Sequence, residues 1–81
     1  MLSEVDKIVE LTSNKNIDFI TLKDEKDGVR CLFFSQEGTY SDLLVRQKSL
    51  ANEIRSYAIA NIIYGNQATK LLKRLHKWIQ A

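Results

Sequence analysis

The chain has 81 residues, of which 44% are hydrophobic and 27% are charged, and its formal net charge is +2. This length allows one domain, and this composition excludes an intrinsically disordered chain. One cysteine excludes an internal disulfide framework, and the acidic N-terminus and short apolar runs argue against a signal peptide and a membrane-spanning helix. We therefore expect a cytoplasmic protein.

The N-terminal segment predicts a helix. Ser3 and Asp6 have the spacing of a capping box, with Asp in the place of the usual Glu or Gln. Apolar residues then recur at helical spacing, and the Asn14 to Asn16 cluster ends the pattern. We expect a first helix at 4–14.

The next segment predicts an antiparallel β-hairpin. Ile, Phe, Thr, Val and Cys are prominent in it, helix formers are scarce outside its central charged stretch, and the pair at 27–28, Asp-Gly, tolerates positive φ in a tight turn. We expect strands at 17–24 and 29–35. The second strand has apolar residues on both faces, with Leu32 and Phe34 opposite to Cys31 and Phe33. We therefore expect this strand to be covered on both sides or to pair along another edge, with the helices covering the hairpin.

A stripe of mainly apolar residues at 100° per residue predicts a long helix at 40–64. Thr39 and Asp42 precede it with capping-box spacing. The stripe consists of Tyr40, Leu43, Leu44, Gln47, Leu50, Ala51, Ile54, Tyr57, Ala58 and Ile62. We expect this stripe to contact the core.

Further apolar residues lie on the back of this predicted helix, and they make its last two turns apolar nearly all round. Either the last helix of the chain folds back over them, or a second copy or another protein covers them. We favour cover by a second copy of the chain. The predicted partner or dimer interface consists of Val45, Ile59, Ala60, Ile63 and Tyr64.

Gly65 and Asn66 suit the end of the long helix and the start of another, at 67–80. One arc of this helix is apolar, and the opposite arc carries Lys70, Lys73, Arg74 and Lys77. Residues 1–65 hold eight Lys or Arg and ten Asp or Glu, a net charge of −2, whereas residues 66–81 hold four and none, a net of +4. Solvation of an amphipathic helix accounts for some of these cations. The absence of acids also predicts an anion or nucleic-acid contact.

The sequence does not predict a catalytic, metal or cofactor site. His76 is the only histidine, Cys31 lies in a predicted strand, and the three glycines are isolated and form no phosphate loop. The acidic residues at 23–27 fall at a hairpin tip, where a solvated turn is the simpler interpretation. We expect neither an enzyme nor a small-molecule substrate.

The sequence thus predicts one α+β domain over residues 1–81, in the order helix, β-hairpin, long helix and amphipathic helix. The predicted function is that of a small interaction or regulatory protein that binds a macromolecule, most readily a protein. It would use the apolar back of the long helix and the basic C-terminal helix. A nucleic-acid-binding regulator using the basic face is the alternative, and membrane contact is disfavoured because the helix is short and its apolar arc is needed for the core.

Overall fold

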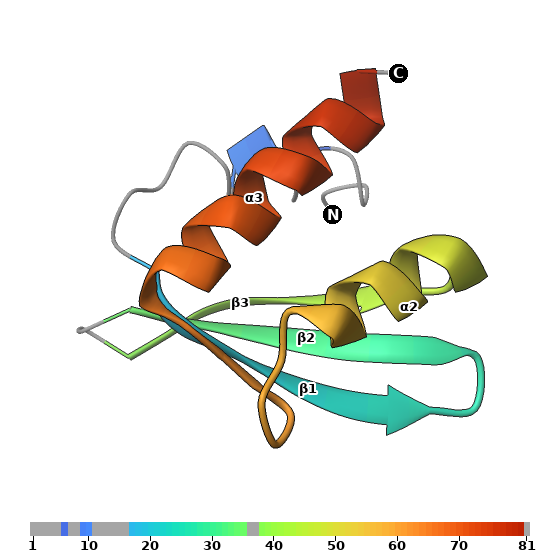
Figure 1. Cartoon of the computed structure of the whole chain (residues 1–81), viewed down its shortest axis with the longest axis horizontal. Helices are drawn as coiled ribbons and strands as arrows, with labels where there is room; N and C mark the ends of the chain where they lie inside the picture. The colour runs from blue at the N-terminus through green and yellow to red at the C-terminus, as the bar shows by residue number, and fades with distance from the viewer. Residues whose placement is uncertain (1–5, 7–8, 11–16, 36–37, 81) are drawn as a thin grey trace.

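A four-stranded antiparallel sheet forms one layer of the protein, and helices form the other (Figure 1). The computed structural model describes residues 6, 9–10, 17–35 and 38–80. Its elements are β1 (Ile17–Glu25), β2 (Gly28–Ser35), β3 (Gly38–Val45), α2 (Lys48–Ser56), β4 (Ile62–Tyr64) and α3 (Gly65–Gln80). The strand order is β3-β2-β1-β4. The α+β class predicted from the sequence is confirmed.

Of the predicted helix at 4–14, the structure describes Asp6, Val9 and Glu10, which have helical backbone. The rest of that segment lies outside the described residues. In the part of the chain that is described, no helix has the length and apolar character needed to cross a membrane.

The β1–β2 hairpin closes through a two-residue turn, because Glu25 pairs directly with Gly28. Gly28 does not have a positive φ, so the conformational reason given above for its presence is wrong. The physical reason is a close approach of two backbones. A Cβ at Gly28 would lie 2.1 Å from the carbonyl oxygen of Val45 and 3.0 Å from the Cα of Arg46. Only glycine lets the end of β3 pass this close to the start of β2.

The predicted helix at 40–64 is wrong, because β3, α2 and β4 occupy this segment. In β3, Leu43 and Val45 are buried while Leu44 between them is only partly buried, which is the alternation of a strand. Pairing with β2, a strand outside the predicted helix, overrides the helical periodicity. Gln47 then starts α2 as its N-cap, and its side chain accepts a hydrogen bond of 2.5 Å from the Leu50 amide.

A tight hairpin turn follows α2 and leads into β4. Ile59 and Ile62 donate to each other's carbonyl oxygens, at 2.9 and 3.0 Å, around the pair Ala60 and Asn61. Both residues of that pair have positive φ, 52° and 64°, which is the signature of a type I′ turn. The Leu22 amide donates to Asn61 O at 2.8 Å and ties the turn to β1.

Gly65 joins β4 to α3 with a φ of 47°. From the sequence we expected Gly65 to end a long helix in left-handed backbone. Gly65 does have left-handed backbone, but it follows strand β4 and not a helix. In α3 the side chains of Ala68, Leu71, Leu72 and Leu75 are buried.

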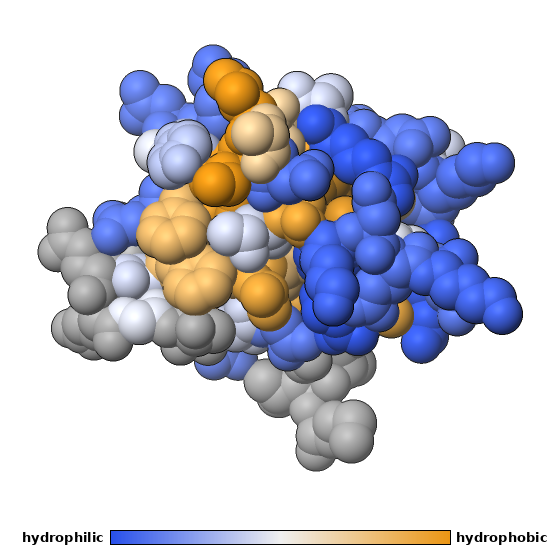
Figure 2. Space-filling view, turned by 90° about the horizontal axis from the view of Figure 1, so that it is seen from below, coloured by the Kyte–Doolittle hydropathy of each residue, from blue (hydrophilic) through white to orange (hydrophobic). Residues whose placement is uncertain are grey.

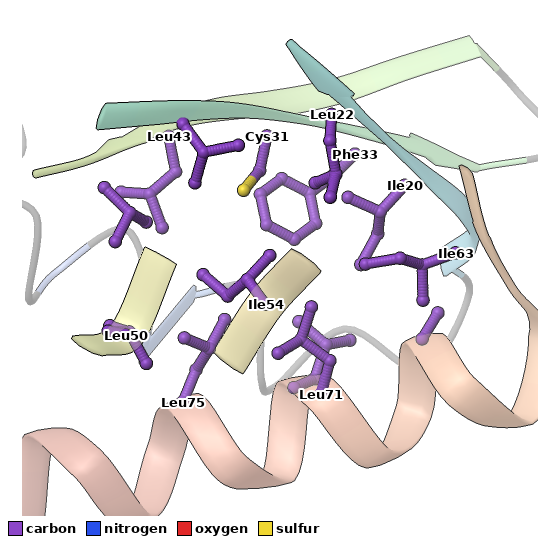
Figure 3. Close-up of a cluster of buried hydrophobic side chains, with 14 of the residues drawn as sticks. Ile20, Leu22, Cys31, Phe33, Leu43, Leu50, Ile54, Ile63, Leu71 and Leu75 are labelled. Carbon is purple, nitrogen blue, oxygen red and sulfur yellow. The ribbon is translucent and has the colours of Figure 1, made fainter. Parts of the chain in front are cut away.

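The core lies between the sheet and the two helices (Figure 3). Helix α3 packs against β1 and β4, and α2 packs against β2 and β3. The buried residues are Ile20, Leu22, Val29, Cys31, Phe33, Leu43, Val45, Leu50, Ala51, Ile54, Ile63, Ala68, Leu71, Leu72 and Leu75. Because α2 and α3 pack on the same face of the sheet, neither of them covers the other face.

Candidate functional site

The helices α2 and α3 lie on one face of the sheet, and no described element covers the opposite face (Figure 1). We call this the open face. Residues of β1 and β2 alternate between the two faces, so Ile20 and Leu22 enter the core while Phe19 and Thr21 point outward. The pairing register continues this assignment onto the neighbouring strands.

An aromatic row crosses the open face at one end. Tyr64 of β4 pairs with Phe19 of β1, and Phe19 pairs with Phe34 of β2. The Phe19 and Phe34 rings are stacked, with centroids 4.8 Å apart and planes at 10°. The Phe19 and Tyr64 rings are 6.3 Å apart and tilted by 40°. Tyr64 nevertheless remains 58% exposed, so this row presents aromatic surface to solvent.

A second, aliphatic row lies beside the aromatic one. Ile62 pairs with Thr21, and Thr21 pairs with Leu32. Ile59 forms a β-bridge with Ile62 across the type I′ turn. Because directly opposed residues of an antiparallel pair lie on the same face, Ile59 extends this row. Ile59 is 78% exposed. The open-face patch, as we use the term below, consists of Phe19, Leu32, Phe34, Ile59, Ile62 and Tyr64.

Charged side chains gather around Arg30 on the open face, although Leu44 pairs with Arg30 and Asp42 pairs with Leu32 of the aliphatic row. Arg30 donates from Nε and Nη2 to the two carboxylate oxygens of Glu25, at 2.5 and 3.3 Å, and from Nη1 to Asp42 Oδ2 at 2.6 Å. The hydrogen bonds from Arg30 lower the pKa of the Glu25 carboxyl. With Lys23, this group carries two cations and two acids, which sum to zero.

The distribution of apolar residues is unusual for a solvated sheet face. An antiparallel sheet with one wet face normally alternates apolar-in and polar-out. Here the outward positions at one end are aromatic or aliphatic except for Thr21, and Figure 2 shows apolar side chains gathered at one side of this face and hydrophilic ones at the other. Large contiguous apolar patches on soluble proteins are candidates for interaction sites.

The predicted interface residues separate into two groups. Val45 and Ile63 are 5% and 0% exposed and belong to the core, so their assignment to a surface is wrong. The apolar back of a long helix does not exist either, since the helix is replaced by β3, α2 and β4. Ile59 and Tyr64 are exposed, and the sheet brings them together on the open face; Ala60 is exposed beside them in the turn.

The predicted basic residues all lie on α3, in the helical layer. Lys70, Lys73 and Lys77 are exposed. Arg74 is only partly exposed, and its Nε lies 2.6 Å from Oε2 of Glu53 on α2. This contact is a close ion pair. These cations are separated from the open-face patch by the sheet itself.

Two described groups that could carry out chemistry, the Cys31 thiol and the Asp24 carboxylate, are enclosed in the core or held in an ion pair. Cys31 is 1% exposed, and burial raises the pKa of its thiol to about 12. Asp24 forms an ion pair with Arg55 at 2.9 Å. Among the described residues, no three or more His, Cys, Asp or Glu side chains are grouped so that they could hold a metal ion.

Sequence reasoning missed Phe19, Leu32, Phe34 and Ile62 as surface residues. A signal was present for two of them, because Leu32 and Phe34 form a second apolar face on a strand whose first face is already apolar. No signal marked Ile62, which was assigned to the core stripe of the predicted long helix.

The chain matches no protein-family model, and neither curated protein sequences nor solved structures include a significant match to it.

Proposed function

We propose that this chain is a small non-enzymatic interaction protein that binds another protein through the open-face patch. The observation that carries the proposal is the aromatic row, in which Tyr64 stays 58% exposed next to the stacked Phe19 and Phe34. Aromatic side chains supply large contact areas at low entropic cost and are enriched at protein interfaces. The single cysteine supports a reducing compartment, and we extend the proposal to the cytoplasm.

A protein partner fits the open face better than a nucleic acid does. Single-stranded nucleic acids stack their bases on exposed ring faces beside a cationic groove. Here one face of the Phe19 ring already stacks on Phe34, and Tyr64 lies against it from the other strand. The charges around Arg30 on this face cancel, and Lys70, Lys73 and Lys77 lie in the other layer.

The test is photo-cross-linking in cells with a photoreactive phenylalanine analogue at position 64 and, in a second variant, at position 73. Position 64 samples the open-face patch, and position 73 samples the exposed side of α3. We expect a discrete protein adduct from position 64 only. Its mass shows whether the partner is a different protein or another copy of the 9.3 kDa chain.

A matched variant shows whether the adduct depends on the patch. Ile59→Ser removes an apolar side chain that is 78% exposed, so it should weaken the adduct from position 64 without unfolding the protein. Absence of any adduct from position 64 in cells would refute the proposed function. An adduct that Ile59→Ser leaves unchanged would also contradict it.

One observation keeps a nucleic-acid-binding role as a second candidate. Lys70, Lys73 and Lys77 are exposed on α3, a segment without acids. Because Arg74 is held by Glu53, about three cations would contact phosphates, and the slope of log affinity against log salt would be about −2.7. Affinity for an oligonucleotide would then fall about 40-fold between about 50 and 200 mM salt. A nucleic-acid adduct from position 73 would favour this candidate.

A further inference from the structure

We infer that the protein bound by the open-face patch is a second copy of this chain, so that two sheets pack face to face between two outer layers of helices. This inference rests on the proposed function, because it names the partner for the same surface. Two antiparallel sheets packed in this way lie about 10 Å apart, with their strands within about 30° of each other. The interior between them would contain the aromatic and aliphatic rows of both copies.

The first argument is the composition of the strands. In β2 the inward residues Cys31 and Phe33 are buried in the core, and the outward residues Leu32 and Phe34 are also apolar. Strands with apolar residues on both faces are typical of sheets that are covered on both sides. The helices cover the inward face of the sheet. The open face of a second copy would cover the outward face with a surface of the same shape and chemistry.

The second argument is electrostatic. A twofold contact places the same surface on both sides, so a face with a net charge repels its copy. The open face avoids this, because Arg30 is neutralised within its own chain by Glu25 and Asp42, and Lys23 brings the sum to zero. A different protein would commonly be selected by complementary charge, and this face offers no net charge to complement. The exposed side of α3, with its three lysines, could not meet a copy of itself.

The third argument is size. Strands lie about 4.8 Å apart and rise about 3.3 Å per residue, so strands of nine, eight, eight and three residues cover a footprint of about 440 Å². The corrugation of the aromatic row and the projecting Ile59 side chain add to the accessible area. The smallest stable protein interfaces bury about 600 Å² per partner. The open face therefore suits a dimer of modest affinity, with a dissociation constant in the micromolar range.

The oligomeric state of the full chain tests this inference by sedimentation velocity over about 5 to 500 µM, a range that brackets the expected affinity. We expect a concentration-dependent monomer–dimer equilibrium. Tyr64→Lys places a cation on both halves of the contact and should raise the dissociation constant about 30-fold or more. Ser49→Lys adds the same charge to an exposed position on α2 and should leave the dissociation constant unchanged. Circular dichroism establishes that both variants are folded.

A second measurement uses the unaltered protein. In a mixture of isotope-labelled and unlabelled chains, filtered NMR spectra should show contacts between copies from the Phe19, Phe34 and Tyr64 rings. Sedimentation as a monomer at all concentrations would overturn the inference, as would a dimer whose contacts come from the helices or from the β3 edge. A monomer would leave the proposed function standing if the position-64 adduct contains a different protein.

Discussion

Replacing Ala60 with glycine should stabilise the protein. Ala60 has a φ of 52° in the type I′ turn between Ile59 and Ile62. A side chain in left-handed backbone costs about 1–2 kcal/mol, which glycine avoids, although glycine loses about 0.5–1 kcal/mol of this gain through the flexibility of the unfolded chain. The expected net gain is about 0.5–1 kcal/mol. At an unfolding entropy of about 2.1 cal/mol/K per residue, this raises the Tm of an 81-residue domain by about 3–6 °C.

Thermal unfolding followed by circular dichroism measures this difference, and urea titration checks that the free energy of unfolding changes in the same direction. Asn61→Gly is the matched control, because asparagine tolerates left-handed backbone better than alanine and should gain less. An unchanged or lowered Tm for Ala60→Gly would refute the reasoning. The turn would then not hold Ala60 in left-handed backbone, and the placement of Ile59 on the open face would lose its support.

Three further predictions concern the interior and the charged residues of the sheet. Gly28→Ala should lower the free energy of unfolding by about 1–3 kcal/mol, because its Cβ would lie 2.1 Å from Val45 O; an unchanged urea midpoint would contradict the close approach. The Cys31 thiol keeps its proton in the folded protein up to a pKa of about 12, whereas an unfolded thiol loses it near 9.0. Its contribution to stability should therefore be complete below about pH 9 and fall by up to about 1.4 kcal/mol per pH unit above it. This slope should be absent from Cys31→Ala, and equal slopes would rule out the assignment. Glu25→Gln should be less stable than the unaltered protein at neutral pH, because the pKa of Glu25 is lowered by Arg30; the gap should close as the pH falls below 4.5 through that lowered pKa, and a constant gap would contradict the role of its charge.

The hairpin was predictable because its information is local. β-branched and aromatic residues on both sides of a two-residue turn predict paired strands, and the sequence placed these at 17–24 and 29–35. The structure has Ile17–Glu25 and Gly28–Ser35. Gly28 was identified as a turn residue, but the physical reason for a glycine at this position was not. The closeness of Gly28 to Val45 depends on a third strand, which the hairpin residues do not specify.

The segment at 40–64 was not predictable by periodicity because two patterns overlap there. Leu43, Leu50 and Ile54 fit one helical stripe, although Leu43 belongs to a strand and the other two to α2. The pairing of β3 with β2 determines that the start of this segment is a strand and not a helix. This pairing cannot be predicted from the local spacing of apolar residues. Gln47 was placed inside the stripe, but its side chain caps α2 and ends the helical run on its N-terminal side.

The candidate site was only partly accessible to the same reasoning. Ile59 and Tyr64 were named as interface residues for their apolar character on a helix, and the structure exposes them on a turn and a strand instead. Phe19 joins them only because β4 pairs with β1, a contact between residues 19 and 64. The sequence predicted that the second hairpin strand is covered on both sides or pairs along another edge, and the pairing of β2 with β3 confirms the second alternative. Cover of the outer face of β2 stays a prediction, which the sedimentation experiment tests.

The position of β4 in the sheet also bears on how the chain is synthesised and folded. The first of the described strands, β1, lies in the interior of the sheet, and one of its edges is completed only by residues 62–64. Until those residues leave the ribosome, the nascent three-stranded unit carries an unpaired edge and an uncovered apolar surface that contains Ile20. Translation products that stop before residue 62 should therefore aggregate or be degraded.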